Sequence, residues 1–216
     1  MEINKMIEHS VLGAGAKSSD IETACQAARK YQFRALVVNP TWIPLAKKLL
    51  AGSSVIVVTV VGFPLGAVTT DIKVAEILRA LHMGAMEFDV VMNIGRARDG
   101  DWISVANEIR LLQYGTRDLN IKVIIECGLL TPAEIVEACH VLKQAEVWAV
   151  KTGTGMGPRG ASLDDVRILK ECVGNSMRIK AAGGIRSYAF ARGLIDAGAD
   201  LIGTSHGPTI MEEAPK

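Results

Sequence analysis

The chain has 216 residues, of which 49% are hydrophobic and 22% charged, and its formal net charge is +1. This length fits one domain over residues 1–216, and the balance of residue types is that of a globular protein rather than a disordered or fibrous one. The near-neutral charge, without a basic run, argues against a nucleic-acid-binding surface but is compatible with a small local anion site.

The cysteines and the N-terminus indicate a reducing compartment. The cysteines are Cys25, Cys127, Cys139 and Cys172. No two of them form a C-x-x-C pair, so the pattern predicts neither a disulfide framework nor a zinc knuckle. Residues 1–10 lack the apolar core of a signal peptide, and apolar runs such as Val55–Val61 are too short to cross a bilayer. We therefore expect a soluble, cytoplasmic protein without membrane partners.

Short β-branched runs alternate with longer amphipathic stretches along the chain. Most of these runs are apolar on both faces, as expected for strands that helices cover. In chain order the predicted strands are Met6–His9, Ala35–Val38, Val55–Val61, Met86–Met92, Ile121–Glu126, Val147–Lys151, Arg178–Ala181 and Leu201–Gly203.

Helix start and stop signals lie between these runs. Predicted helices begin at Ser19 or Asp20 and run to Lys30, cover Asp71–Met83, begin after Thr131 and at Ser162, and run from Ser187 to Gly198. Glycine and proline in residues 62–66 and 153–160 are typical of connecting loops.

Alternating βα units predict a parallel sheet. Eight units favour closure into a single (β/α)8 TIM barrel, and an open doubly wound sheet is the alternative. In such barrels the catalytic residues lie at the C-terminal ends of the strands. Several predicted strands end at a polar or charged residue, namely Glu8, Asp89, Glu126, Lys151 and Lys180.

Two of these residues, Lys151 and Lys180, end consecutive predicted strands. Neighbouring strands lie about 5 Å apart, so the two ammonium groups would be close to each other. Their repulsion would ease loss of a proton from one of them, and a neutral lysine amine is what addition to a carbonyl requires. One such lysine is often a structural ion-pair partner, but two together favour Schiff-base chemistry.

Asp89 interrupts an otherwise apolar predicted strand. Alternation places Glu87, Asp89 and Val91 on one face, either inside or outside the barrel. A carboxylate inside a barrel requires a nearby cation. We predict an acid/base role for Asp89 beside the lysines, with a structural salt bridge as the alternative. Glu8 is a similar candidate, whereas Lys122 begins its strand and is assigned to stability at the opposite face.

Two glycine-containing loops predict a phosphate site. Residues 182–186 (Ala-Gly-Gly-Ile-Arg) follow the seventh predicted strand, and residues 203–207 (Gly-Thr-Ser-His-Gly) follow the eighth. Barrels often bind phosphate in these two loops, at a helix N-terminus. A Gly-Gly pair also occurs in ordinary turns, but glycines in both loops favour an anion site. The loop at residues 153–160 is placed to close over it.

The histidines form no metal-binding motif. No H-x-H or H-E-x-x-H spacing occurs, and His82 and His140 fall in predicted helices, where we expect them on the surface. Because no zinc-binding cluster can be assembled, no metal site is predicted. The tryptophans are isolated and form no base-stacking platform, which again argues against a nucleic-acid partner.

Eight segments match one known family in order and spacing. They are Glu8-His-Ser10, Val37-Val-Asn-Pro40, Gly62-Phe-Pro-Leu-Gly66, Glu87-Phe-Asp89, Lys122-Val-Ile-Ile-Glu126, Val150-Lys-Thr152, Lys180-Ala-Ala-Gly-Gly-Ile-Arg186 and Gly203-Thr-Ser205. From about Ile7 to Gly207 the chain resembles deoxyribose-phosphate aldolases. The resemblance implies a (β/α)8 fold, a class I aldolase without a cofactor, and a homo-oligomer, commonly a dimer.

The family's functional residues carry over position by position. Lys151 matches the Schiff-base lysine, Lys180 the second lysine that lowers its pKa, and Asp89 the carboxylate of proton transfer. The resemblance also places Gly155, Gly183, Gly184 and Ser205 at phosphate-loop positions. With them we predict Glu8, Thr154 and His206 as further substrate-binding or phosphate-binding residues.

The chain departs from the family near the implied substrate site. Glu8 stands where the family usually has aspartate, Val37 where members often have cysteine, and Gly153 where the common motif has serine. Met156 replaces a lysine of some members, and His206 replaces a second serine. We expect these changes to bear on substrate identity.

Two further features concern the same site. His206 or Arg159 is a candidate to replace the lost phosphate contacts. The chain ends Glu-Glu-Ala-Pro-Lys, without the terminal tyrosine that some members use in proton transfer.

The predicted activity is reversible cleavage of 2-deoxy-D-ribose 5-phosphate to D-glyceraldehyde 3-phosphate and acetaldehyde. One alternative is a Schiff-base aldolase of the same family acting on a different sugar. A second is a barrel that binds a sugar phosphate without turnover, which retention of Lys151, Lys180 and Asp89 argues against.

Overall fold

A closed barrel of parallel strands forms the centre of the molecule. The computed structural model describes residues 2–117 and 119–215. The strands pair in chain order, and β8 pairs back with β1, so the predicted (β/α)8 barrel is confirmed over the open sheet. The strands are β1 (Ile7–Val11), β2 (Ala35–Val38), β3 (Ile56–Val61), β4 (Glu87–Val91), β5 (Asn120–Ile124), β6 (Ala149–Lys151), β7 (Arg178–Ala182) and β8 (Leu201–Thr204).

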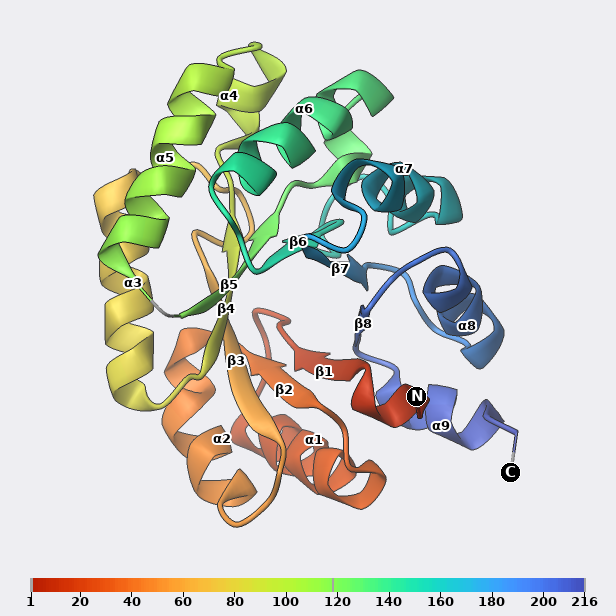
Figure 1. The fold of residues 1–216 in the computed structure, drawn as a ribbon. Helices are drawn as coiled ribbons and strands as arrows, with labels where there is room; N and C mark the ends of the chain where they lie inside the picture. Colours follow the sequence, from red (N-terminus) through yellow and green to blue (C-terminus); the bar gives the residue numbers. More distant parts are fainter. Residues whose placement is uncertain (1, 118, 216) are drawn as a thin grey trace.

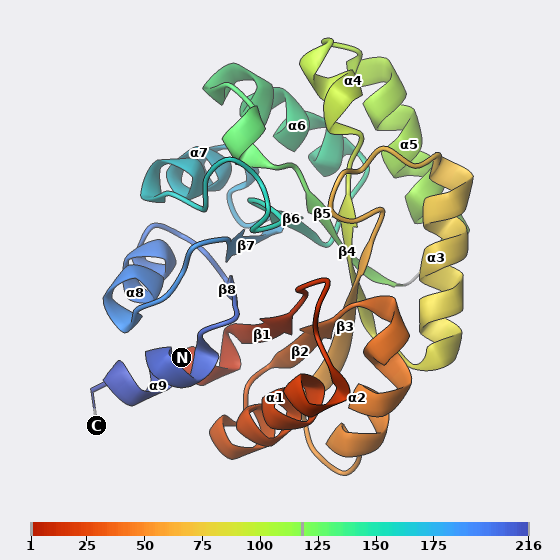
Figure 2. The ribbon, with the colours of Figure 1, turned by 180° about the vertical axis from the view of Figure 1, so that it is seen from behind.

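A ring of helices surrounds the strands, as both views of the ribbon show (Figures 1 and 2). The α-helices are α1 (Ser18–Tyr31), α2 (Ile43–Leu50), α3 (Thr70–Met83), α4 (Ile94–Arg98), α5 (Trp102–Gly115), α6 (Pro132–Gln144), α7 (Leu163–Val173), α8 (Tyr188–Asp196) and α9 (Gly207–Glu213). Short 3-10 turns are η1 (Ile3–Lys5), η2 (Pro40–Trp42) and η3 (Cys127–Leu129).

Side-chain caps explain why the predicted helices begin where they do. The hydroxyls of Thr131 and Ser162 accept hydrogen bonds from the backbone N–H groups of Glu134 and Asp165, at 3.3 and 3.1 Å. In each case the acidic side chain accepts a bond back from the capping residue, which completes a capping box. Helices α2, α4 and α5 were not predicted.

Most strands begin or end one or two residues away from their predicted bounds, and two of these differences affect the site. β5 ends at Ile124, so Glu126 lies beyond the strand rather than at its end. β7 continues to Ala182, so Lys180 lies in its middle. Glu8 and Asp89 are likewise within their strands, and of the five polar strand ends predicted only Lys151 is a strand's last residue.

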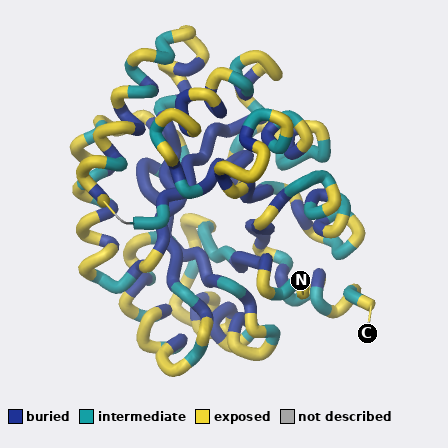
Figure 3. Tube along the Cα trace, viewed as in Figure 1, coloured by how far each residue is buried: buried dark blue, intermediate teal, exposed yellow. Residues whose placement is uncertain are grey.

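Apolar side chains fill the space between the barrel and the helices, where the strands are buried and the outer helix faces are exposed (Figure 3). Inside the barrel, a separate small apolar cluster comprises Ala35, Val37, Val58 and Val60 of β2 and β3. TIM-barrel interiors are normally filled by layers of branched apolar residues. Here β1, β4, β5, β6 and β7 contribute charged side chains instead, and these form the candidate site.

Two further features concern the helices and the cysteines. Within the described residues, we find no helix with both the length and the apolar character needed to cross a bilayer. All four cysteines are free thiols in the structure.

Candidate active site

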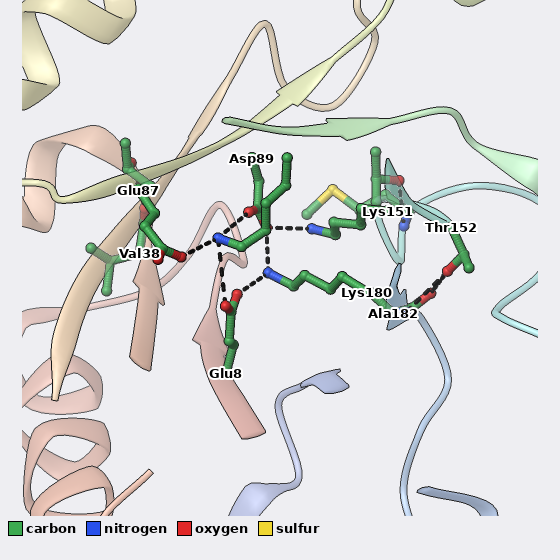
Figure 4. Close-up of polar contacts among 12 residues, drawn as sticks. Glu8, Val38, Glu87, Asp89, Lys151, Thr152, Lys180 and Ala182 are labelled. Carbon is green, nitrogen blue, oxygen red and sulfur yellow. Dashed lines mark hydrogen bonds and ion pairs between the residues drawn. The ribbon is translucent and has the colours of Figure 1, made fainter. Parts of the chain in front are cut away.

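The register of β6 and β7 brings Lys151 and Lys180 together. The two residues are direct partners across the parallel pair. Both side chains point into the barrel (Figure 4), and the residues are only 3% and 1% exposed. The prediction that neighbouring strands would place these lysines side by side is confirmed.

Asp89 faces the two lysines from β4, which resolves the predicted ambiguity in favour of the interior (Figure 4). Its Oδ2 accepts hydrogen bonds from the Nζ atoms of Lys151 and Lys180, at 2.9 and 2.5 Å. Complete burial favours the neutral acid, but the charges of Lys151, Lys180 and Lys122 outweigh burial and hold the pKa of Asp89 well below its usual range. Asp89 is therefore an ionised carboxylate between two amines.

Lys151 loses its proton far more readily than an ordinary lysine in water, because burial lowers its pKa from 10.5 to about 8. The negative charge of Asp89 raises this pKa, and the positive charge of Lys180 lowers it. Repulsion between the lysines was the predicted cause of a lowered pKa, whereas in the structure burial is the larger cause.

Glu8 lies behind Lys180 rather than at a surface where substrate would bind. It is fully buried, and its carboxylate accepts hydrogen bonds from Lys180 and from Arg34. The structure thus corrects the expectation that Glu8 contacts substrate. Its effect on the site is to fix the position of the Lys180 ammonium group.

Lys122 was assigned to stability at the opposite face, and that assignment is incomplete. Its side chain is fully buried in the barrel interior, with Nζ 2.7 Å from Glu87 Oε2 and 3.3 Å from Asp89 Oδ1. The shared face of Glu87 and Asp89, together with the pairing of Asp89 with Lys122, could have revealed this contact. Arg34, which directly precedes β2 and pairs with Glu87 at 2.5 Å, was also missed.

A cavity of about 240 Å³ opens at the C-terminal ends of the strands and reaches both lysines. Every predicted binding position except Glu8 lines it. The relevant lining residues are Ser10, Val37, Thr154, Gly155, Met156, Gly183, Gly184, Arg186, Ser205 and His206. The loops after β6, β7 and β8 therefore surround one site.

Glycines let the loops after β6 and β7 pack closely. The backbone N–H of Ala161 donates a hydrogen bond to the carbonyl of Gly183 at 3.0 Å. A Cβ atom on Gly160 would overlap that carbonyl group, and Gly183 has a φ of +100° that disfavours any side chain. The peptide groups of this loop can therefore approach a ligand closely.

The charges near the cavity differ from those expected. Arg159 does not line it, because its guanidinium is held by Asp165 and by the carbonyl of Cys127, both within 3.1 Å. Arg159, one of the two candidates to replace phosphate contacts, thus does not line the cavity. Arg186 lines the cavity and is exposed, and His206 lies there with Nδ1 3.1 Å from Ser205 Oγ.

Glu126 anchors the loop that follows Lys151. Its Oε2 accepts hydrogen bonds from the backbone N–H and the hydroxyl of Thr154, at 3.0 and 2.5 Å. Glu126 itself adopts a left-handed conformation with φ of +55°, which is costly for a residue with a side chain. A Cβ on Gly153 would lie 2.6 Å from Glu126 Oε1, so the glycine at this position leaves room for the carboxylate.

Comparison with known proteins decides the family. The model of the DeoC/LacD family aldolases matches residues 4–211. The deoxyribose-phosphate aldolase of Streptococcus pneumoniae serotype 19F (strain G54) is 46% identical over 212 residues, which are 98% of this chain and 96% of that protein. The chain belongs to the DeoC/LacD aldolase family.

Solved structures agree with this membership. An aldolase designated QR15 is 34% identical and superposes with a TM-score of 0.94 over 99% of this chain and 96% of its own. A tetrameric deoxyribose phosphate aldolase from Aeropyrum pernix is 29% identical, with a TM-score of 0.87 over 97% of this chain and 89% of its own. These two proteins thus share this chain's barrel over almost its full length.

The site of this DeoC/LacD aldolase is rich in amines and poor in metal ligands. Over residues 2–117 and 119–215, no group of three histidine, cysteine or acidic side chains is arranged to hold a metal ion. The histidines predicted on the surface, His82 and His140, are exposed. The groups that reach the cavity floor are the amines of Lys151 and Lys180, and Asp89 lies directly behind them.

Proposed function

We propose that the protein is a class I aldolase that reversibly cleaves 2-deoxy-D-ribose 5-phosphate to D-glyceraldehyde 3-phosphate and acetaldehyde. The observation that carries this proposal is a buried amine, Lys151, with a pKa near 8 and an ionised Asp89 at 2.9 Å, beneath a cavity walled by glycine-containing loops. The relatives named above support the choice of substrate.

Lys151 is the proposed nucleophile. Its neutral Nζ adds to the C1 aldehyde of the open-chain sugar, and loss of water gives a protonated imine. Asp89, directly or through a water molecule, accepts the proton of the C3 hydroxyl as the C2–C3 bond breaks. The electron pair of that bond moves to the iminium and forms an enamine, and C3 leaves as the aldehyde of glyceraldehyde 3-phosphate.

The second half of the reaction regenerates the free enzyme. The enamine is protonated at C2, water adds to the resulting imine, and acetaldehyde leaves with regeneration of the Lys151 amine. Lys180, hydrogen-bonded to Asp89 at 2.5 Å, is the group placed to pass protons to and from that carboxylate. All steps use protein side chains and water, and none requires a metal or cofactor.

The phosphate is proposed to bind at the loops after β6, β7 and β8. Backbone N–H groups near glycines and the hydroxyl of Ser205 are suited to phosphate oxygens. Arg186 and His206 add side chains of positive or potentially positive charge in the same cavity. Together they are proposed to replace the lysine that some relatives have at the position of Met156.

A second candidate function keeps the chemistry and changes the substrate. Met156 and His206 alter the mouth of the cavity relative to the family pattern, and both line it. A panel of phosphorylated and unphosphorylated aldehydes and sugars separates the two candidates. Deoxyribose 5-phosphate should show the highest kcat/KM; a higher value for another sugar would transfer the proposal to that substrate.

The decisive experiment is mass spectrometry after borohydride reduction in the presence of 2-deoxyribose 5-phosphate. We expect an adduct at Lys151 that survives EDTA and is absent from the Lys151→Leu variant. An adduct at a different lysine would overturn the assignment. No adduct with any carbonyl compound would favour the binding protein without turnover.

Two further proposals concern the molecule in the cell. We propose that it forms a homodimer, following the family resemblance, although the Aeropyrum pernix relative is described as a tetramer. We also propose a cytoplasmic location, which is consistent with the four free thiols.

A further inference from the structure

The barrel interior holds one continuous network of charged side chains. Its carboxylates are Glu8, Glu87 and Asp89, and its cations are Arg34, Lys122, Lys151 and Lys180. Arg34 is 20% exposed at the far end, and every other side chain in the network is at most 4% exposed. The network therefore spans the barrel from the cavity to the opposite face, with little solvent to screen its charges.

The cations differ in how many carboxylates they contact. Lys122 lies within 3.5 Å of all three. Arg34 pairs with Glu8 and Glu87, and Lys180 pairs with Glu8 and Asp89. Among the carboxylates of residues 2–117 and 119–215, Lys151 contacts Asp89 alone, and it shares that carboxylate with Lys180 and Lys122.

Counting charge identifies Lys151 as the surplus cation. Three ionised carboxylates are balanced by Arg34, Lys122 and Lys180. A proton on Lys151 would leave one net positive charge in a buried space, which is unfavourable. With Lys151 neutral the interior charge is zero, so the least-paired amine is the one that the network favours in the neutral form.

Other groups near Lys151 do not change this count. β2 and β3 contribute the apolar cluster Ala35, Val37, Val58 and Val60 to the interior, and β8 contributes Gly203 beside Lys180. On the cavity side, the buried carboxylate of Glu126 lies beyond β5, where it accepts hydrogen bonds from Thr154. Besides the two lysines, the titratable side chains that line the cavity are Arg186 and His206. Both stand at a cavity open to solvent, where their charges are better screened than those inside the barrel.

We propose that Lys122 is a positioning residue for the reaction, which sets the protonation state of Lys151 by supplying the third fixed positive charge of the barrel interior. This inference rests on the proposed role of Lys151 as the Schiff-base lysine. Lys122 does not line the cavity, so it acts through Asp89 and through the charge balance rather than on substrate. Glu87 acts on the same balance with the opposite sign.

The test measures the apparent pKa on the acidic limb of kcat/KM for deoxyribose 5-phosphate cleavage, which reports the free enzyme. Lys122→Met leaves an excess of negative charge and should raise this pKa by about 1 pH unit or more. Glu87→Gln leaves an excess of positive charge and should lower it. The double variant restores the balance and should return the value toward that of the unmodified protein.

Controls separate charge from structural damage. Lys122→Arg keeps the charge and should leave the apparent pKa within about 0.3 pH units, while the exposed Lys48→Met removes a surface charge and should do the same. If Lys122→Met does not fold, the apparent pKa of Glu87→Gln still tests the proposal. The charge balance predicts a lower apparent pKa for this variant, and structural damage by itself does not. Shifts of equal sign in the two single variants, or no shift, would overturn the proposal.

The outcome is distinguishable from failure of the proposed function. Borohydride trapping at Lys151 in the unmodified protein tests that function first. If the adduct forms and the pKa values do not move in opposite directions, the Schiff-base assignment stands and the role of Lys122 is rejected.

Discussion

Lys151 illustrates how one residue acquires reactivity from its surroundings. An amine in water has a pKa of about 10.4, and burial of the Lys151 side chain lowers it to about 8. Asp89 opposes this change and Lys180 assists it. The ionised Asp89 is kept charged by the lysines around it, so a base and a neutral amine can coexist 2.9 Å apart.

This pKa predicts how iminium formation depends on pH. The amine is neutral above its pKa, so the rate of trapping at Lys151 should rise with pH and level off above about pH 8. Below that value it should fall about tenfold per pH unit, because the neutral fraction does so. Single-turnover trapping between pH 6 and 10 measures this dependence. A midpoint near pH 10 would mean that Lys151 titrates as a solvent-exposed lysine.

At the scale of elements, the loops after β6 and β7 act as one unit because glycines allow their backbones to touch. Ala161 donates to the Gly183 carbonyl, and Glu126 holds Thr154 from the other side. The loop between Lys151 and α7 is thus fixed at both flanks. The sequence predicted this loop and its position over the site, but not the Glu126 anchor.

Gly160→Ala tests the packing of these loops. The new methyl group would lie 2.8 Å from the Gly183 carbonyl carbon, so the backbone must shift, at a cost of about 1–3 kcal/mol of stability. We expect KM for deoxyribose 5-phosphate to rise about tenfold, since one such polar contact contributes about 1.5 kcal/mol. Trapping with an unphosphorylated aldehyde should change much less.

A matched control is Gly15→Ala, at a glycine with no neighbouring atom within 4 Å of the added methyl group. For both variants, kcat and KM for deoxyribose 5-phosphate and the midpoint of thermal unfolding are measured and compared. If Gly160→Ala lowered activity equally with phosphorylated and unphosphorylated substrates, the loop contact would support Lys151 rather than the phosphate.

At the scale of the whole molecule, the homodimer proposal makes a simple prediction. The chain has a mass of 23.1 kDa, so light scattering during size-exclusion chromatography should give twice that value. A dimer that persists on dilution to micromolar protein would indicate a stable interface. A mass of one chain would refute the proposal, and a mass of four chains would indicate an assembly like the one described for the Aeropyrum pernix relative.

The sequence alone determined the barrel, the order of its strands and the pair of lysines, because these follow from local patterns. Alternating βα units require a parallel sheet, and consecutive strands in a barrel are neighbours, so Lys151 and Lys180 had to be close. Helix starts at Thr131 and Ser162 were likewise readable, since a cap depends on residues three apart.

Only the tertiary structure decided which charges meet. The sequence placed Glu87 and Asp89 on one face but could not say whether that face was inside. It predicted neither the contact of Lys122 with Asp89 nor that of Glu8 with Lys180. Arg34, Glu87 and Lys122 come from three strand regions far apart in the chain. Their contacts depend on strand tilt, register and side-chain length, which place them together only when the barrel closes.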